Sequence, residues 1–420
     1  MATLAPKQQL AVDFALAGHS IFLTGSAGVG KSYTLKYIIE ELKEVHGKHV
    51  YVTASTGIAA LAICGTTLHS FAGVGLGTAP VDELIRNLNK VAKYHWQSCK
   101  VLVIDEISMV SCDLFTKLDA IAKWVKQSLL PFGGIQLVLC GDFFQLPPVP
   151  DRNWPKSMPL FAFQSDAWKQ AVAHTIELTK VFRQSEEGFV SMLNSLRRGK
   201  VPNCYSLLAN CFTERLEQDR LAHTILYPLK VDVSRENHTH LNALDEEEHE
   251  FFAQDTGDPK YLTQLQKNCT AEDVIKLRTG AQVILLKSMT VEDGRVRLVN
   301  GSRGVVTDFD EEDYPIVDFE NATDVNIQPT TFSMEVSGKT VATRTQIPLA
   351  LAWALSIHKS QGMSIDKVYL DLSCVFEYGQ AYVALSRART LAGLKLAPFH
   401  PSVIKAHPQV IQFYDSLTST

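Results

Sequence analysis

Residues 25–32 read Gly25-Ser26-Ala27-Gly28-Val29-Gly30-Lys31-Ser32. This G-x-x-x-x-G-K-S pattern follows an apolar run at residues 21–24 and precedes a helix-forming stretch at residues 33–45, which is the context that phosphate-binding loops require. Backbone N–H groups of the loop are expected to wrap phosphates, with Lys31 reaching the β- and γ-phosphates and the Ser32 hydroxyl binding Mg²⁺. A plain glycine turn before a helix is the alternative, and the preceding strand weakens it.

A second apolar run, at residues 101–104, ends in the acidic pair Asp105 and Glu106. Because adjacent residues point to opposite sides of a strand, Asp105 is the expected Mg²⁺ ligand, while Glu106 is free to orient or deprotonate an attacking water. An acidic pair after a strand is more often a plain loop when it stands alone. Together with the phosphate-binding loop, it favours a site for ATP and Mg²⁺.

Short β-branched runs alternate with helical stretches in the first part of the chain. The runs lie at residues 21–24, 50–54, 101–104 and 136–140. This alternation predicts βα units around a parallel sheet, which binds ligands at the carboxyl ends of its strands. We therefore expect an α/β first lobe at residues 1–180.

A second lobe is expected in two pieces, at residues 181–249 and 344–420, because strand and helix signals at residues 224–227 and 232–244 resume only near residue 347. Between the pieces, residues 250–343 are rich in short alternating runs and turn residues, which predicts a small barrel or curled sheet. The acidic run at residues 245–250 is interpreted as a solvated helix end or linker.

Composition restricts the class of protein. The 420 residues are 46% hydrophobic and 20% charged, and the formal net charge is −5. No apolar run approaches the roughly 20 residues that span a bilayer, so a soluble intracellular protein without a membrane partner is expected. The negative charge argues against coating of nucleic acid by bulk charge and confines any DNA contact to a channel. The eight cysteines include no C-x-x-C pair, so buried reduced thiols are expected.

Two arginines are candidates for the transition state of phosphoryl transfer, which commonly needs positive charge from an arginine of another lobe. Arg183 follows the last expected strand of the first lobe, and Arg387 lies in the second lobe. Each of them, taken alone, is more simply explained as a surface residue.

With these residues in view, the chain resembles the PIF-one family of superfamily-one DNA helicases over nearly its whole length. Beyond the loop and the acidic pair, the resemblance is carried by Thr53-Ala54-Ser55-Thr56-Gly57-Ile58-Ala59-Ala60, Gly65-Thr66-Thr67-Leu68-His69-Ser70-Phe71, Gly141-Asp142-Phe143-Phe144-Gln145-Leu146-Pro147-Pro148, Ser356-Ile357-His358-Lys359-Ser360-Gln361-Gly362 and the Arg387 segment. Residues 117–136 resemble the family's own signature.

The resemblance implies two RecA-like lobes with ATP between them. It also implies 5′ to 3′ travel on single-stranded DNA, and action on forked duplexes, G-quadruplexes and RNA–DNA hybrids. Gln8 would read adenine, Gln145 would sense the γ-phosphate, and Gln361 and Gly362 would couple the second lobe to the nucleotide. The insertion at about residues 71–88 resembles the strand-separating wedge, and the β-rich insert resembles the family's small barrel over the DNA.

Several loop residues carry donors or rings suited to nucleic acid. The candidates for DNA contact are Thr56, Thr66, Thr67, His69, Phe71, Phe143, Phe144 and Pro147 in the first lobe, and His358, Lys359 and Ser360 in the second. Contacts to phosphates carry no sequence information, which suits an enzyme that passes over any base. The alternatives are structural roles for the two histidines and core packing for the three phenylalanines.

The function expected is an ATP-dependent DNA helicase of genome maintenance, acting in DNA repair, recombination, replication and telomere maintenance. We expect a monomer, with dimerisation on DNA as the alternative. Expected locations are the nucleus or mitochondrion of a eukaryote, or the cytoplasm for a bacterial or viral protein. Two rival functions are open. One is a translocase that displaces proteins without unwinding and shares every ATPase residue with a helicase. The other is a nucleotide-controlled DNA-binding switch. Strand displacement separates helicase from translocase, and stimulation of ATP hydrolysis by single-stranded DNA separates both from the switch.

Overall fold

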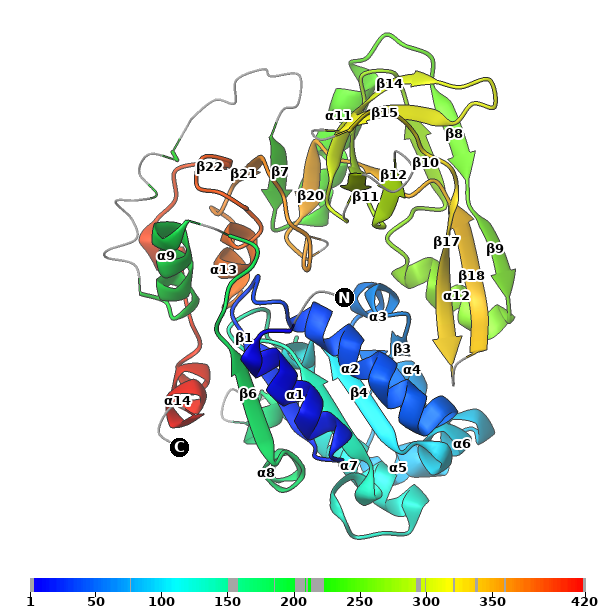
Figure 1. Cartoon of the computed structure of the whole chain (residues 1–420), viewed down its shortest axis with the longest axis vertical. Helices are drawn as coiled ribbons and strands as arrows, with labels where there is room; N and C mark the ends of the chain where they lie inside the picture. The colour runs from blue at the N-terminus through cyan, green and yellow to red at the C-terminus, as the bar shows by residue number, and fades with distance from the viewer. Residues whose placement is uncertain are drawn as a thin grey trace. The chain divides into compact units, whose positions relative to one another are not determined.

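The computed structural model describes residues 4–75, 77–149, 158–184, 186–200, 208, 211–212, 223–291, 296–298, 300–319, 322–336, 339–358 and 360–417. The chain divides into two compact units, whose elements are labelled in Figure 1. Unit 1 comprises residues 1–182, 333–341 and 407–420, and unit 2 comprises residues 183–332 and 342–406.

Unit 1 is built on a six-stranded parallel sheet with the strand order β3-β2-β4-β5-β1-β6. Its strands are β1 (Ile21–Gly25), β2 (Val50–Ala54), β3 (Thr66–Thr67), β4 (Val101–Asp105), β5 (Gln136–Cys140) and β6 (His174–Leu178). The residues of β1, β2 and β4 are buried throughout, which is typical of parallel strands covered by helices. The four runs predicted as strands are therefore confirmed, and they are consecutive in this sheet.

The helices of unit 1 that precede β6 pack on this sheet or on one another. They are α1 (Pro6–Leu16), α2 (Lys31–His46), α3 (Gly57–Ala62), α4 (Leu68–Ala72), α5 (Val81–Arg86), α6 (Lys90–Ser98), α7 (Cys112–Lys126) and α8 (Asp166–Ala171), with short 3₁₀ turns at Gly47–His49, Ile107–Met109, Pro131–Gly134 and Ala162–Gln164. Helix α2 buries Leu35, Ile38, Ile39 and Leu42, one helical face, in the core that also contains Ile21. Figure 1 shows α1 and α2 side by side against the sheet.

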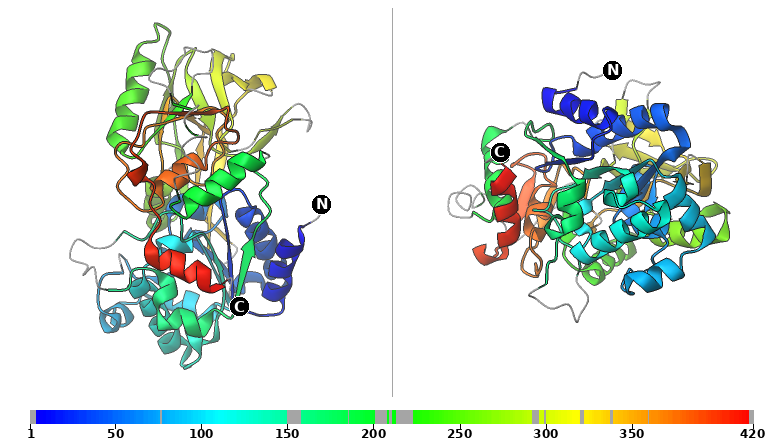
Figure 2. Two further views of the ribbon diagram at one scale, coloured as in Figure 1. Left: turned by 90° about the vertical axis from the view of Figure 1, so that its left-hand side faces the viewer. Right: turned by 90° about the horizontal axis from the view of Figure 1, so that it is seen from below.

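Helix α14 (Pro408–Leu417) departs from the expected domain division, which placed residues 344–420 in the second lobe. It packs on unit 1, as Figure 2 also shows. The Phe413 ring stacks on the Phe163 ring at a centroid distance of 4.2 Å, and Tyr414 is 1% exposed. Because the apolar face of α14 finds its ring partners in unit 1, residues 407–420 belong to that unit.

Unit 2 contains a four-stranded parallel sheet with the order β20-β7-β21-β22. Its strands are β7 (Thr224–Tyr227), β20 (Ala354–Ser356), β21 (Val368–Leu370) and β22 (Leu394–Leu396), and its helices are α9 (Glu187–Arg197), α11 (Lys230–Asn242) and α13 (Gln380–Leu385), with a 3₁₀ turn at Pro401–Val403. The strand predicted at residues 224–227 is confirmed. The helix predicted at residues 232–244 is also confirmed, and it begins two residues earlier. A parallel sheet in each unit is the fold expected of two RecA-like lobes.

The β-rich insert interrupts this second sheet. Its elements are β8 (His249–Phe252), β9 (Gln254–Gly257), α12 (Pro259–Asn268), β10 (Val274–Leu277), β11 (Gln282–Leu285), β12 (Met289–Val291), β13 (Val296–Leu298), β14 (Arg303–Phe309), β15 (Pro315–Phe319), β16 (Ala322–Asn326), β17 (Thr330–Val336), β18 (Lys339–Gln346) and β19 (Leu349–Leu351). Five strands form an antiparallel sheet in the order β16-β15-β14-β11-β19. Its buried face, which includes Val283, Val306 and Val317, forms a core of its own.

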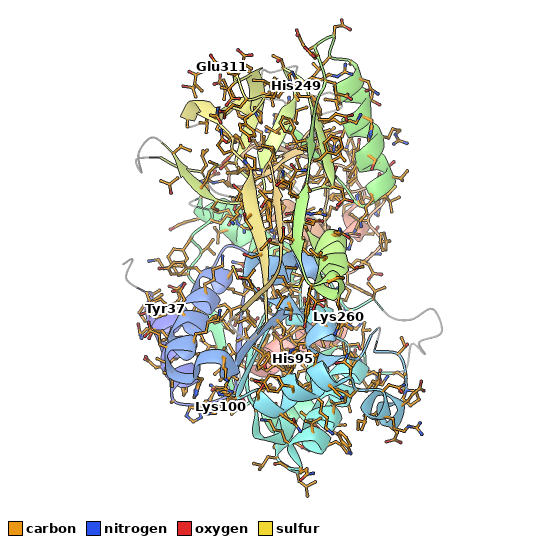
Figure 3. The ribbon with its side chains drawn as sticks, turned by 90° about the vertical axis from the view of Figure 1, so that its right-hand side faces the viewer. Tyr37, His95, Lys100, His249, Lys260 and Glu311 are labelled. Carbon is orange, nitrogen blue, oxygen red and sulfur yellow. The ribbon has the colours of Figure 1, made fainter. Side chains whose placement is uncertain are left out.

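The acidic run at residues 245–250 joins the second lobe to the insert, and only its last two residues lie in a strand. Residues 249–252 form β8, which pairs with β10. Lys276 of β10 forms ion pairs with Glu248 and Glu250 at 2.8 and 2.5 Å. His249 stacks on Phe309 at 3.7 Å, and Figure 3 shows His249 and Glu311 at the same end of the insert. Residues 245–248 thus lie between α11 and β8, as expected of a linker, whereas residues 249 and 250 belong to the strand.

Among the described residues, no helix combines the length and the apolar character needed to cross a membrane. The described cysteines are all free thiols, and Cys99, Cys140 and Cys211 are buried as expected. Cys64 and Cys374 are exposed, so a buried position was the wrong expectation for them. Cys204 lies outside the described residues.

Candidate nucleotide-binding site

The loop between β1 and α2 needs its glycines for steric reasons. Gly30 has φ +82°, and a Cβ there would lie 2.9 Å from Nε2 of Gln8. Gly25 has φ +140°, and a Cβ there would lie 2.4 Å from the carbonyl oxygen of Leu178. Ala27 and Val29 are buried, so of these two residues only the backbone is suited to contact a phosphate. The loop is thus fixed in a conformation that only glycine permits at both ends.

Lys31 opens α2, and its ammonium group lies over the loop. Its Nζ donates to the carbonyl oxygens of Gly25 at 2.8 Å and Ser26 at 3.0 Å. Ser32 follows it in the first turn of α2. The start of a helix, the loop amides and this ammonium together make a site for an anionic phosphate group.

Asp105 ends β4, a neighbour of β5 in the same sheet, and is 6% exposed. Burial raises the pKa of its carboxyl group, whereas a hydrogen bond from the Glu106 amide at 2.9 Å and the nearby Lys31 ammonium oppose that rise. The Cys140 thiol also hydrogen-bonds to this carboxylate. A buried carboxylate and the Ser32 hydroxyl beside a phosphate loop provide the oxygen donors that Mg²⁺ prefers, so these residues fit the metal.

Glu106 occupies an unusual backbone conformation for its residue type, with φ +50° and ψ +46°. Its carbonyl oxygen accepts a hydrogen bond from the Ser55 hydroxyl at 2.8 Å, and the Ser55 amide donates to the Asp105 carbonyl oxygen at 3.1 Å. Left-handed backbone at a residue other than glycine costs energy and is often retained at functional sites. The ends of β2 and β4 therefore hold this turn together.

Two glutamines expected at the nucleotide are buried in unit 1. Gln8 is 4% exposed; its Oε1 accepts from the Ala5 amide at 2.9 Å, and its Nε2 faces Gly30. Gln145 is 6% exposed, and its amide donates to the Asp142 carbonyl oxygen at 2.9 Å. The structure thus brings Gln8 to the phosphate loop and fixes Gln145 in the turn that follows β5.

Arg387 lies inside unit 2, where it is 2% exposed. Its guanidinium donates to the carbonyl oxygens of Val383 at 2.8 Å, Met363 at 3.2 Å and Ser360 at 3.3 Å, and to the Ser386 hydroxyl at 2.8 Å. These bonds join α13 to the segment that contains Gln361. Arg387 therefore has a structural role in unit 2 in this conformation.

Arg183 and Gln361 lie near the same segment of unit 2. Arg183 donates to the carbonyl oxygens of Ser386 at 3.1 Å and Gly362 at 3.4 Å, and desolvation lowers its pKa to about 10, which leaves it charged at neutral pH. Nε2 of Gln361 is buried and has no hydrogen-bond partner among the described residues. Gly362 is exposed with φ +82° and open space around its Cα.

The donors predicted to contact DNA in unit 1 lie around α3 and α4. The Thr56 hydroxyl accepts from the Ala59 amide at 3.3 Å, and the Thr67 hydroxyl accepts from the Ser70 amide at 3.3 Å, so both cap short helices. Thr66 is 6% exposed. His69 is half-buried, and burial lowers its pKa, so it is a neutral donor at pH 7.

Base stacking is the wrong expectation for the three phenylalanines. Phe71, Phe143 and Phe144 are each 2% exposed. Phe71 packs on Trp96 at 4.8 Å, and Phe144 stacks on Tyr414 at 4.7 Å. A ring enclosed on both faces has none left for a base, so the alternative of core packing holds.

Two further candidates for DNA contact are buried, and one is not described. Pro147 is buried in the segment after β5. Ser360 is 0% exposed, and its hydroxyl donates to the Ile357 carbonyl oxygen at 2.8 Å, so it stabilises its own turn instead of presenting a donor. His358 is half-buried, and burial and the Lys230 charge lower its pKa. Lys359 lies outside the described residues.

The glycine-rich insertion after Phe71 is attached to α7. Nζ of Lys117 donates to the carbonyl oxygens of Gly77 at 3.0 Å and Thr78 at 3.4 Å, and pairs with Asp113 at 2.6 Å. A Cβ at Gly77 would lie 3.0 Å from Leu114. The first residue of the signature segment therefore anchors the base of the expected wedge.

Comparisons with known proteins agree with this geometry. The sequence profile described as PIF1-like helicase matches residues 7–206, and that described as DNA helicase Pif1, 2B domain, matches residues 260–309. The ATP-dependent DNA helicase PIF1 of Xenopus laevis is 44% identical over 418 residues, covering 99% of this chain and 64% of that protein. The crystal structure of Pif1 helicase from Candida albicans matches with a TM-score of 0.77 and 41% identity, over 99% of this chain and 100% of that one. The chain belongs to the PIF1-like helicase family.

Another member of the family is known with ligands. The crystal structure of Pif1 helicase from Bacteroides in complex with ADP-AlF3 and single-stranded DNA has a TM-score of 0.68 and 31% identity, over 100% of this chain and 98% of that one. The β-rich insert corresponds to the family's 2B domain. The chain spans 64% of the length of its Xenopus relative.

Sequence patterns did not indicate two residues that lie at this site, Phe182 and Cys140. Phe182 is 54% exposed; its amide donates to the Gly28 carbonyl oxygen at 2.8 Å, and its ring would lie 3.6 Å from a Cβ at Gly30. Cys140 contacts Asp105 from the end of the neighbouring strand. An exposed aromatic residue directly before Arg183 was a signal for the first, whereas nothing in the local sequence marks the second.

Proposed function

We propose that this chain is an ATP-dependent DNA helicase that moves 5′ to 3′ on single-stranded DNA and unwinds duplexes. The observation that carries the proposal is the phosphate loop with Lys31 beside the buried carboxylate of Asp105, in a chain whose Candida relative is a Pif1 helicase. The Bacteroides relative that holds ADP-AlF3 and single-stranded DNA supports both ligands. Forked duplexes, G-quadruplexes and RNA–DNA hybrids are the proposed substrates, in genome maintenance inside the cell.

Each group at the site has a proposed role. Lys31 and the loop amides bind the β- and γ-phosphates, and Ser32 and Asp105 would hold Mg²⁺, which supplies positive charge to the phosphate oxygens when bound. Glu106 accepts a proton from the attacking water, since its side chain follows the metal ligand directly. Gln145 contacts the γ-phosphate from the turn after β5.

The remaining roles concern the base and the transition state. Gln8 reads the adenine edge through its amide, and the exposed Phe182 ring provides a flat apolar face for the same base. Arg183 and Arg387 supply positive charge to the transferred phosphoryl group. For Arg387, this role requires that the guanidinium leave the carbonyl oxygens that hold it in unit 2. Gln361, whose Nε2 is buried without a partner, and Gly362 respond to the nucleotide.

The experiment that tests the function measures unwinding of two duplexes that differ only in the polarity of a single-stranded tail. Wild-type protein with ATP and Mg²⁺ is expected to separate the duplex with the 5′ tail and to leave the 3′-tailed duplex intact. Lys31→Ala is the control, because it removes the ammonium group while its loop keeps all its glycines. ATP hydrolysis stimulated by DNA without strand separation would favour a protein-displacing translocase, and hydrolysis indifferent to DNA would favour a nucleotide-controlled switch.

A further inference from the structure

Helix α14 packs on unit 1 next to the two segments that precede the phosphate loop and the Gln145 turn. Phe413 and Tyr414 extend from it into unit 1, where Phe413 stacks on Phe163 and Tyr414 stacks on Phe144. Figure 2 shows α14 beside the elements of unit 1. The helix is thus joined by ring contacts to residues that follow β5, although about 270 residues of chain separate Asp142 from Tyr414.

The Tyr414 hydroxyl lies at the centre of a buried hydrogen-bond network. It donates to Oδ1 of Asp142 at 3.3 Å and accepts from the Phe143 amide at 3.3 Å. The Thr24 hydroxyl lies 2.6 Å away and donates to it, because the phenol hydrogen is directed to Asp142. These bonds use the single donor and both acceptor positions of a phenol. Thr24 and Asp142 are 0% exposed, so no water competes.

The partners of this hydroxyl belong to the two segments that would hold the γ-phosphate. Thr24 directly precedes Gly25, where the phosphate loop begins. Asp142 opens the turn whose carbonyl oxygen accepts from the Gln145 amide at 2.9 Å. A single oxygen atom therefore connects the carboxyl end of β1 to that of β5.

Packing alone does not account for the hydroxyl. The ring contacts of residue 414 would be made equally well by phenylalanine, and a phenol buried among aromatic rings costs free energy unless each of its hydrogen bonds is made. The Asp142 carboxylate, with 0% exposure, needs such donors; it also accepts from the Phe144 amide at 3.2 Å. The network thus fixes a distance between segments, in addition to filling space.

We propose that Tyr414 is a positioning residue for nucleotide hydrolysis, which holds the phosphate loop and the Gln145 turn at a fixed separation through Thr24 and Asp142. The proposal rests on the ATPase function proposed above. It makes α14 part of the hydrolytic apparatus of unit 1, without contact to the nucleotide.

The test removes only the hydroxyl. Tyr414→Phe keeps the ring stacked on Phe144 but removes the oxygen atom that joins Thr24 to Asp142. Because displacement of a catalytic group by about 1 Å can cost up to roughly 100-fold in rate, we expect kcat for DNA-stimulated ATP hydrolysis to fall about 10-fold. The KM for ATP should change less than about twofold, since ground-state binding by the loop is retained.

A matched control is available in the same unit. Tyr51 is 4% exposed, and its hydroxyl hydrogen-bonds to the Ser98 hydroxyl at 2.7 Å, away from the phosphate loop. Tyr51→Phe also removes a phenol hydroxyl from unit 1 and should lower the thermal midpoint, with kcat unchanged. A fall in kcat shared by both variants would mean a general loss of stability and would overturn the proposal.

Two further measurements separate positioning from packing. Binding of ADP with aluminium fluoride, followed by fluorescence, should weaken in Tyr414→Phe while binding of ADP alone does not. Thr24→Val breaks the same network from the other side, so the double variant with Tyr414→Phe should be no slower than the slower single variant. Additive losses or a wild-type kcat in Tyr414→Phe would refute the role of Tyr414, whereas a wild-type protein without ATPase activity would refute the proposed function itself.

Discussion

Gly30→Ala offers a direct test of how Gln8 and the phosphate loop depend on each other. Gly30 has φ +82°, and an alanine Cβ would lie 2.9 Å from Nε2 of Gln8, closer than such atoms approach in proteins. Gly18 is a matched control because it has φ +85° and nothing within 4 Å of its Cβ position. The two substitutions therefore impose the same backbone strain, and only one of them displaces Gln8.

The magnitude follows from these two terms. Left-handed backbone costs an L-residue roughly 1–2 kcal/mol, and this cost is common to both variants. At Gly30 the Gln8 amide must also move, which breaks its hydrogen bond to the Ala5 amide at 2.9 Å. Such a bond contributes about 1 kcal/mol, so Gly30→Ala should lower the free energy of unfolding by about 1 kcal/mol more than Gly18→Ala.

The functional effect should appear in base selectivity. A side-chain amide that pairs with adenine contributes about 1–3 kcal/mol of discrimination, or roughly 5- to 150-fold. We expect the ratio of kcat/KM for ATP to that for GTP to fall by about this factor in Gly30→Ala, as in Gln8→Ala. Gly18→Ala should keep the wild-type ratio. The assay is phosphate release in the presence of single-stranded DNA.

Two results would refute this reasoning in different ways. If Gln8→Ala keeps its preference for ATP, Gln8 does not read the base. If Gln8→Ala loses the preference while Gly30→Ala keeps it, the loop accommodates the methyl group without moving the Gln8 amide. The close approach of Gln8 to Gly30 would then have no effect on base selectivity.

Three other predictions concern stability and reactivity. Arg344→Met should destabilise unit 2 by about 1.5–3 kcal/mol in urea denaturation, because the part-buried Asp255 carboxylate loses a bidentate partner at 2.8 Å. An unchanged midpoint would contradict this. Iodoacetamide should label the exposed Cys64 and should not label Cys140 until guanidinium unfolds the chain, because burial raises the pKa of the Cys140 thiol far above its usual value. Peptide mass spectrometry would detect the order of labelling. Burial lowers the pKa of His69 below its unfolded value of about 6.5, so its contribution to stability is present above that pH and is lost as the pH falls through it. His69→Gln should therefore weaken the fall in thermal midpoint below about pH 6.5, and an identical fall in both proteins would exclude this role.

The sequence predicted those structural features that depend on residues close together in the chain. The apolar run at residues 101–104 predicts a buried strand, and the acidic pair after it marks the end of that strand. The spacing of the glycines before Lys31 predicts the phosphate loop. Both can be recognised within about ten residues of sequence, and both lie at the carboxyl ends of strands in one parallel sheet, β1 and β4, with β5 between them. The β-rich insert was equally visible, since alternation and turn residues repeat along it.

The features that sequence reasoning missed depend on contacts between distant residues. Phe143 and Phe144 had the composition of a base-stacking pair, but α14 supplies the ring partners that bury them. Nothing near residue 414 shows that its hydroxyl meets Thr24, because 390 positions separate the two. For the same reason, residues 407–420 were assigned to the wrong unit.

The place of β1 in its sheet has a consequence for biosynthesis. This strand lies between β5 and β6, so it leaves the ribosome well before either neighbour exists. Even then, the rings of Phe22 and Trp168 lack one of their aromatic neighbours until Phe413 has been translated. The nascent first lobe must therefore persist with an open apolar face while the whole of unit 2 is made, and truncated chains that lack α14 should be preferred clients of chaperones and proteases.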